Sequence, residues 1–278
     1  MKRTFVTLGI AAAAVFAARA DNTPELNTRH HFPDKAHDAK PGGGAKPNSN
    51  LVNHGGPVIA APRVVAIFWG PSWNTGGADN ATAKHIEAFF GQFATSSHLD
   101  MLPQYSNAAS QAPSNMLSHS VYDTSTPPTN VTDAAVQAEV LKALNGAAPD
   151  SSTIYEVFLP PSSYSSDGTS TSCGGPHLAY CAYHGHFSNG GHDIKYSSMP
   201  YPSCGGCISN SSWTAGQNID HFSCHETREA ITDEDLNAWY DRRGNEADDK
   251  CAWSPNPFLD GQYGYQYEWS NAAGGCVK

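Results

Sequence analysis

The residues with the clearest chemical potential form the motif H-E-x-x-E, which is made by His225, Glu226 and Glu229. In an α-helix, His225 and Glu229 stand four positions apart and project from the same face, one turn from each other. Imidazole and carboxylate groups both coordinate divalent metal ions. Glu226 follows His225 directly, where it can reach a metal-bound water and act as a general base. The motif matches the H-E-x-x-H of metallopeptidases with the second His replaced by Glu.

The helix that must carry this motif is predicted over residues 217–231. Ile219 and Phe222, three positions apart, are expected to pack on its inner side, which also carries Glu226 and Glu229. The segment Tyr180 to Phe187 is predicted to be a strand, in which His184 and His186 share one face. In zinc peptidases an edge strand beside the helix pairs with the substrate, so we expect His184 to polarise the oxyanion there, or else to pack under the helix as a structural side chain. Tyr201 is a weaker candidate for the same role.

The remaining elements alternate between strand and helix. Short apolar runs bounded by Pro and Gly predict strands, and apolar residues recurring every three or four positions predict helices. Thr132 is a plausible N-terminal cap for the second helix, and Asn80 for the first. The predicted elements are a strand at 63–69, a helix at 82–93, a short strand at 121–122, a helix at 132–144, and strands at 153–159, 196–201 and 263–269. This order indicates an α/β or α+β fold with a mixed sheet packed by helices.

The first twenty residues read as a signal peptide for export. Lys2 and Arg3 precede a short apolar run, and Ala18-Arg19-Ala20 matches a cleavage site, so we expect the mature chain to begin at Asp21. Residues 21–50 contain little apolar surface and are predicted to form a disordered tail or propeptide. Residues 51–278 are predicted to form a single domain, because their length suits one domain of generous size.

The charge balance narrows the classes of partner. The predicted signal peptide holds three basic residues and no acid, so the rest of the chain has 13 Lys and Arg against 26 Asp and Glu. An acidic chain without a basic cluster argues against nucleic acid and against anionic membrane surfaces. We therefore expect a secreted or periplasmic monomer that acts on a peptide or on cell-wall material.

All seven cysteines lie in the C-terminal half, beyond residue 172. An exported chain permits disulfides, and an odd number leaves at least one thiol unpaired. Cys224 is the candidate for the free thiol, because it lies inside the predicted helix. Local pairing then predicts the disulfides Cys173–Cys181, Cys204–Cys207 and Cys251–Cys276.

With these elements placed, the chain resembles the EXORDIUM or phosphate-induced proteins of plants and their bacterial relatives. The helix motif is the most specific part, and Cys224 and the acidic run Asp233-Glu234-Asp235 depart from the family pattern. The matching blocks are Asn53-His54-Gly55-Gly56-Pro57, Val64 to Trp69 with Trp73, Cys181-Ala182-Tyr183-His184, His225-Glu226-x-x-Glu229-Ala230 with Thr232, Asn237-Ala238-Trp239-Tyr240, Glu246-x-x-Asp249-x-Cys251, and Trp269-Ser270-Asn271 with Cys276.

The resemblance implies an exported protein linked to cell-wall responses, and it carries two further metal ligands. A metal centre needs a third protein ligand and an open position. Asp249 is the preferred third ligand and Glu246 the second choice, and the disulfide of Cys251 would hold their loop. The His favours Zn²⁺ as the cofactor, while the carboxylates leave Mn²⁺ and Ca²⁺ open.

Two functions follow from these residues. The first is a secreted metal-dependent hydrolase, a peptidase with a zincin-like active-site helix, that uses Glu226 as its base. The second is a non-catalytic extracellular or cell-wall-associated binding protein, in which the same cluster holds a structural metal or forms a hydrogen-bonded knot. The retained Glu226 favours the enzyme, because a structural site has no need of it. The replaced His favours the binding protein.

Overall fold

A computed structural model describes residues 28–31, 50–168 and 170–278. Its centre is a mixed sheet in which β9, β6, β3 and β4 run parallel to one another, while β8 and β1 are antiparallel to their neighbours. The predicted mixed α and β content is therefore confirmed. In spatial order the strands are β1 (Thr28–His31), β8 (Ala182–Asn189), β9 (His192–Met199), β6 (Thr153–Phe158), β3 (Arg63–Trp69) and β4 (Leu117–Asp123).

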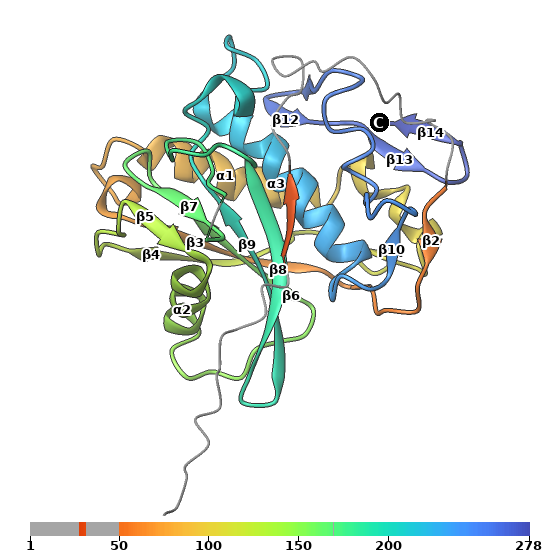
Figure 1. The fold of residues 1–278 in the computed structure, drawn as a ribbon, viewed down its shortest axis with the longest axis horizontal. Helices are drawn as coiled ribbons and strands as arrows, with labels where there is room; N and C mark the ends of the chain where they lie inside the picture. The colour runs from red at the N-terminus through yellow and green to blue at the C-terminus, as the bar shows by residue number, and fades with distance from the viewer. Residues whose placement is uncertain (1–27, 32–49, 169) are drawn as a thin grey trace, which may run out of the picture.

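Helices cover both faces of this sheet (Figure 1). α1 (Asn80–Phe93) and α3 (Ala215–Thr232) pack on one face, where their aromatic and aliphatic side chains meet alternate residues of β3 such as Ala66 and Phe68. α2 (Asp133–Leu144) packs on the other face against the intervening residues Val65 and Ile67. The period-2 alternation of β3 thus divides the core into two layers.

The sequence located most of these elements within two residues of their ends, but the strands predicted at 121–122 and 196–201 each begin four residues earlier, as Leu117–Asp123 and His192–Met199. β3 has the predicted bounds, and Thr132 caps α2 by accepting a hydrogen bond from Ala135. The predicted cap of α1 is wrong, because Asn80 lies inside the helix and its side chain donates to the carbonyl of Trp73 instead.

The C-terminal region folds over the outer side of α3 as short two-stranded sheets and loops (Figure 1). The predicted continuous strand over residues 263–269 is two strands, and the side chain of Gln266, which lies between them, is fully buried. α3 is consequently buried on all sides. The remaining elements are β2 (Val52–Asn53), β5 (Asn130–Thr132), β7 (Tyr164–Ser166), β10 (Trp239–Tyr240), β11 (Phe258–Asp260), β12 (Tyr263–Tyr265), β13 (Glu268–Ser270), β14 (Gly275–Val277) and the 3₁₀ turns η2 (Pro71–Trp73), η3 (Ser97–Leu99), η4 (Leu102–Gln104) and η5 (Gly205–Cys207).

Three disulfides hold the C-terminal half, and two of them differ from the predicted pairing. Cys251–Cys276 is confirmed, and Cys224 is free and buried as expected. The other two bridges are Cys173–Cys204 and Cys181–Cys207, so the predicted local pairs 173–181 and 204–207 are wrong. Pairing by shortest loop fails here because the turn at η5 packs against the segment that leads into β8. Both thiols of that turn therefore face distant partners.

The predicted tail contains one ordered stretch among the residues that are described. Thr28–His31 forms β1 and pairs with β8, and residues 21–27 and 32–49 lie outside the described residues. Of the three histidines in the predicted tail, His30 and His31 fall in this strand and His37 is outside the described residues. The pairing makes β1 the edge of the sheet, so the expectation that β8 is an open edge strand is not met.

Candidate metal centre

α3 places His225 and Glu229 on one side, as the four-residue spacing predicts. The helix starts from a capping box, in which Thr214 accepts from the backbone of Gln217 and the Gln217 side chain accepts in return from the backbone of Thr214. One turn apart in this helix, the Nε2 atom of His225 lies 3.1 Å from the Oε2 atom of Glu229. Both side chains are at most 1% exposed. An imidazole and a carboxylate therefore meet inside the protein.

A loop after α3 brings two more carboxylates to the same place. The Oδ1 atom of Asp249 lies 3.7 Å from the Nε2 atom of His225. The backbone N–H of Asp249 donates to Oε1 of Glu229 at 3.0 Å, and that of Glu246 donates to Oδ2 of Asp249 at 3.1 Å. One oxygen of Glu229 and one of Asp249 are thus held by the main chain. The other oxygen of each faces the imidazole of His225.

β8 supplies His184 from the sheet beneath α3. Its Nε2 atom lies 3.3 Å from Oε2 of Glu246 and 3.7 Å from Oε2 of Glu229, and the side chain is fully buried. The structure therefore brings His184 into the carboxylate cluster itself. His186, two residues along the strand, lies 3.0 Å from Asp193 instead and takes no part in this cluster.

Gln266 fixes which nitrogen of His225 faces the carboxylates. The Nε2 group of Gln266 donates to two oxygens of Asp248, so its Oε1 atom must face the other way. That oxygen lies 3.1 Å from Nδ1 of His225 and 2.8 Å from Nε2 of His221, and it accepts from both rings. With Nδ1 protonated, the lone pair of His225 is on Nε2, on the side of Glu229 and Asp249. A hydrogen bond from the ring nitrogen that faces away from the ligand cluster is typical of a metal-binding His.

Glu226 contributes a further carboxylate, which interacts electrostatically with Glu229, Asp249 and Glu246. It is fully buried, and neither of its oxygens has a hydrogen-bond partner among the described residues. Burial raises the pKa of Glu226 well above its ordinary value, and the charges of Glu229, Asp249 and Glu246 add to this effect. A buried carboxylate without a partner is costly, and a positive charge beside it would remove much of that cost.

Burial also shifts the pKa values of two neighbouring groups, Asp249 and His225. Burial, and secondly the charge of Glu229, raises the pKa of Asp249 to about 7. Burial lowers the pKa of His225 to about 4, so that its imidazole is neutral at pH 7. A neutral imidazole beside crowded carboxylates has the donor atoms of a divalent metal site.

The four acid and imidazole groups predicted as metal ligands, His225, Glu229, Asp249 and Glu246, thus lie together, and His184 joins them. Two further sets of supporting residues were not found from the sequence. Gln266 gave no signal, because it stands in an alternating aromatic run that reads as a strand. The ion pairs of buried Arg228 with Asp248 and Glu268 attach α3 to the C-terminal region. Arg228 lies within the motif itself, but the sequence did not indicate that its side chain is fully buried.

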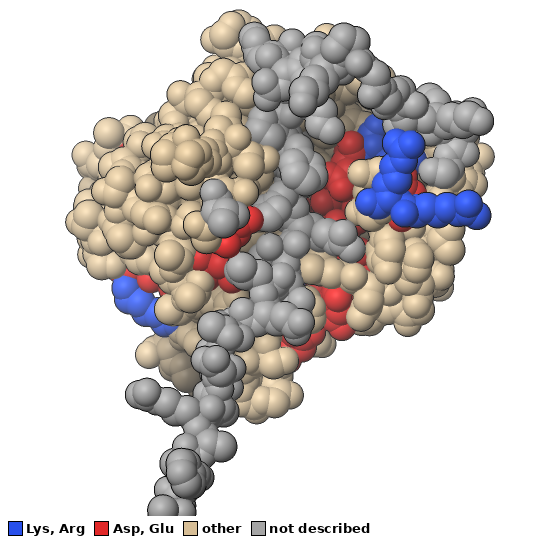
Figure 2. Space-filling model, viewed as in Figure 1, with Lys and Arg blue, Asp and Glu red and all other residues tan. Residues whose placement is uncertain are grey.

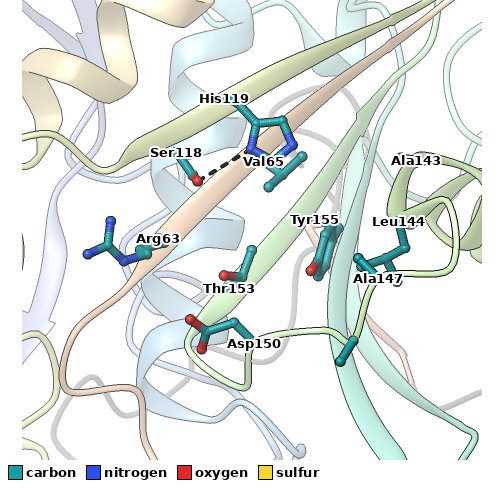
Figure 3. Close-up of a pocket in the computed structure, with 11 residues that line it drawn as sticks. Arg63, Val65, Ser118, His119, Ala143, Leu144, Ala147, Asp150, Thr153 and Tyr155 are labelled. Atoms are coloured by element: carbon teal, nitrogen blue, oxygen red, sulfur yellow. Dashed lines mark hydrogen bonds between the residues drawn. The ribbon is translucent and has the colours of Figure 1, made fainter.

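Other sequence candidates and cavities lie away from this cluster. The ring of Tyr201 packs against Trp73 at 6.0 Å between centroids, far along the α1 side of the core, which leaves its predicted oxyanion role without support. A cavity of about 400 Å³ opens on the α2 face of the sheet, lined by residues such as Arg63, His119 and Tyr155 (Figure 3). None of the clustered carboxylates and imidazoles lines it.

Acidic side chains lie on the face that displays β8 and α3. Figure 2 shows Asp and Glu in separate patches there, with Lys and Arg side chains beside the patch at the upper right. Asp249 is the one ligand candidate with some exposure, at 14% of its side chain, while His184, His225, Glu229 and Glu246 are at most 1% exposed. Asp249 is therefore the ligand candidate that solvent reaches most easily.

Comparison with known proteins finds no matching family model, no matching curated protein and no matching solved structure. The resemblance described above therefore stays a prediction. The three disulfides indicate that the chain folds in an oxidising environment. Within the described part of the chain, no helix has the length and apolar character needed to cross a bilayer.

Proposed function

We propose that the protein is a secreted metal-dependent hydrolase that cleaves peptides, with Glu226 as its general base. His225, Glu229, Asp249 and Glu246 would hold the metal, and Zn²⁺ is the first choice because two imidazoles border the cluster. The resemblance to EXORDIUM proteins belongs to the same proposal, as do export from the cell, a monomeric state and an extracellular peptide substrate.

The observation that carries this proposal is the position of Glu226. Its carboxylate is fully buried beside the ligand cluster and makes no hydrogen bond among the described residues. A site that only needs to bind a metal gains nothing from an extra buried acid, which costs stability. A hydrolase needs a base that can take the proton of the attacking water.

The residues of the chain divide the chemistry as follows. A dication held by His225, Glu229, Asp249 and Glu246 would supply a Lewis acid to polarise the substrate carbonyl and to lower the pKa of water. Gln266 orients His225 by accepting from Nδ1, and the backbone of Asp249 orients Glu229. Glu226 accepts the proton of water and returns it to the leaving amine. Positive charge nearby lowers the pKa of Glu226, so that it is ionised when the site is loaded.

The experiment compares metal content and cleavage in matched variants. The purified chain is loaded with Zn²⁺ and incubated with a library of peptides, and products are measured by mass spectrometry. Glu226→Gln should bind metal like the wild type and lose cleavage about 100- to 10,000-fold, the range for a general base. Glu139→Gln is the control, because Glu139 is a buried carboxylate on α2, which packs on the opposite face of the sheet. Equal cleavage by Glu226→Gln and the wild type would show the assignment of the base to be wrong.

A second function is favoured by the burial of the centre. The ligand candidates other than Asp249 are at most 1% exposed, which suits a structural metal in an extracellular binding protein. In that case metal would bind, and neither the wild type nor any variant would cleave a peptide.

A further inference from the structure

The coordinating side chains of the centre form two sets that share Glu229. One set is His225, Glu229 and Asp249, and the other is His184, Glu229 and Glu246. In each set the donor atoms lie within 4.8 Å of one another. The same oxygen of Glu229, Oε2, lies 3.1 Å from the imidazole of His225 and 3.7 Å from that of His184. A single carboxylate therefore stands between two imidazoles.

The closest pair of ligand atoms in each set has the spacing expected around one metal ion, and the other printed pair, at 3.7 Å in both sets, is slightly longer. Ligand atoms at about 2.1 Å from a tetrahedral or octahedral ion are about 3.0 to 3.4 Å from their nearest neighbours. The closest pairs, His225 with Glu229 at 3.1 Å and His184 with Glu246 at 3.3 Å, fall in this range. A carboxylate that bridges two ions about 3.5 to 4 Å apart is the usual centre of a two-metal site.

The cluster offers carboxylates for both ions. Glu229, Glu246 and Asp249 each face an imidazole of the cluster, and carboxylate and imidazole are common ligands of divalent ions.

We propose that the centre binds two divalent cations bridged by Glu229, one held by His225 and Asp249 and the other by His184 and Glu246. The inference deepens the proposed hydrolase, although the binding of two ions does not require turnover. One imidazole and carboxylates for each ion suit Zn²⁺ or Mn²⁺.

The test is metal stoichiometry. The full chain is stripped with a chelator and titrated with Zn²⁺ against a chromophoric competitor, and the bound metal is measured by mass spectrometry. The wild type should bind two equivalents, and Glu246→Gln and Asp249→Asn should each bind one. His98→Gln, which replaces another buried imidazole that is paired with Asp260, is the matched control and should bind two.

One equivalent in the wild type overturns the proposal, as does the loss of all metal in both single-ligand variants. Because a variant can fail to fold, the wild type loaded with Mn²⁺ gives a second readout. Its electron paramagnetic resonance spectrum should show the spin coupling of a Mn²⁺ pair, and the spectrum of isolated Mn²⁺ contradicts a shared bridge. Two equivalents without peptide cleavage would leave the two-ion centre intact and refute the hydrolase.

The pairing of β1 with β8 carries a second, independent inference. β1 is antiparallel to β8, with Arg29 opposite His184 and Thr28 opposite Gly185. It lies beside β8 and in contact with α3, as the red arrow in Figure 1 shows. The segment Thr28–His31 therefore runs along the strand that carries His184, a ligand candidate of the centre.

Without β1, β8 would be the edge of the sheet, because its other neighbour is β9. An open strand edge presents unpaired N–H and C=O groups and binds extended peptides by adding a strand. β1 has only four residues, so main-chain pairing over a short length holds it there. A short strand such as β1 can be displaced by a competing peptide or removed by proteolysis.

The geometry points to the outer edge of β8, at Ala182 to Gly185, as a peptide-binding surface that Thr28–His31 covers in the intact chain. Binding at this edge is separate from catalysis, whereas its use for cleavage rests on the proposed function. A peptide bound there would run antiparallel to β8 and pass the centre at His184, as residue 29 does.

The test uses the mature chain with a protease recognition sequence inserted between Gly43 and Gly44. A fluorescent peptide of residues 25–34 is titrated before and after cutting, once the released segment has been removed by gel filtration. Fluorescence anisotropy should show at least tenfold tighter binding to the cut protein, and a scrambled peptide should bind neither form. Equal binding to both forms, or to neither, overturns the inference. Peptide binding without cleavage would contradict the hydrolase alone.

Discussion

Removal of metal should change how the stability of the protein depends on pH, and Asp249 gives the expected size of the change. In the metal-free protein the pKa of Asp249 is raised from 3.8 to about 7, chiefly by burial and then by Glu229. Between these two values the folded chain keeps a proton that the unfolded chain releases. The stability of the metal-free protein therefore falls as the pH rises through this window.

Each pH unit in the window is worth about 1.4 kcal/mol for one proton, so Asp249 alone accounts for a loss of about 4 kcal/mol between pH 4 and 7. Glu226, whose pKa is also raised, acts in the same direction. Bound metal reverses the sign, because the ion binds only the ionised ligands and its affinity grows as the protons leave. The stability difference between loaded and stripped protein should therefore increase from pH 5 to pH 8.

The assay is urea unfolding at pH 5, 6, 7 and 8, with excess Zn²⁺ or with a chelator. Other buried carboxyls with raised pKa values, such as Glu139, titrate in both states and cancel in the difference. Asp249→Asn removes the titrating group, so the stripped variant should lose less stability with rising pH than the stripped wild type. A loaded-minus-stripped difference that stays constant across these pH values would refute the reasoning.

Three other predictions concern the supports of the centre. Thr214→Ala removes the N-terminal cap of α3 and should lower the free energy of unfolding by about 1 kcal/mol in urea titrations, without changing metal content. Replacing Cys251 and Cys276 together by Ser opens a bridge of sequence separation 25 and should cost about 3 kcal/mol, again measured in urea, and an unchanged midpoint would contradict the assigned stabilisation. Cys224 is fully buried, and this burial raises the pKa of its thiol to about 12. A thiol reagent such as dithionitrobenzoate should therefore react with one thiol per chain only after unfolding. Rapid reaction of the folded protein would contradict the burial of Cys224.

Some features of the centre could be predicted from the sequence because they depend on local spacing. The separation of His225 and Glu229 sets their common side in any helix, and the structure places their side chains 3.1 Å apart. Asp249 and Glu246 came from a motif resemblance, and both lie in the cluster. Cys224 followed from an odd count of thiols and from its place in the helix.

Other features depend on partners that are distant along the chain. His184 meets Glu246 across 62 positions, and the ring of His225 is oriented by Gln266 across 41. Gln266 stands in a run that resembles a single strand, and only the break between β12 and β13 turns it inward. Spacing along the chain carries no information about such contacts.

The sequence by itself determined the helix with its H-E-x-x-E face, the positions of most of the strands and the acidic character of the chain. The tertiary structure decided which cysteines pair, that Thr28–His31 closes the edge of the sheet, and that two imidazoles share Glu229. The physical reason is that periodicity records which face of an element is buried. The identity of the group that it meets depends on how the whole chain closes around α3.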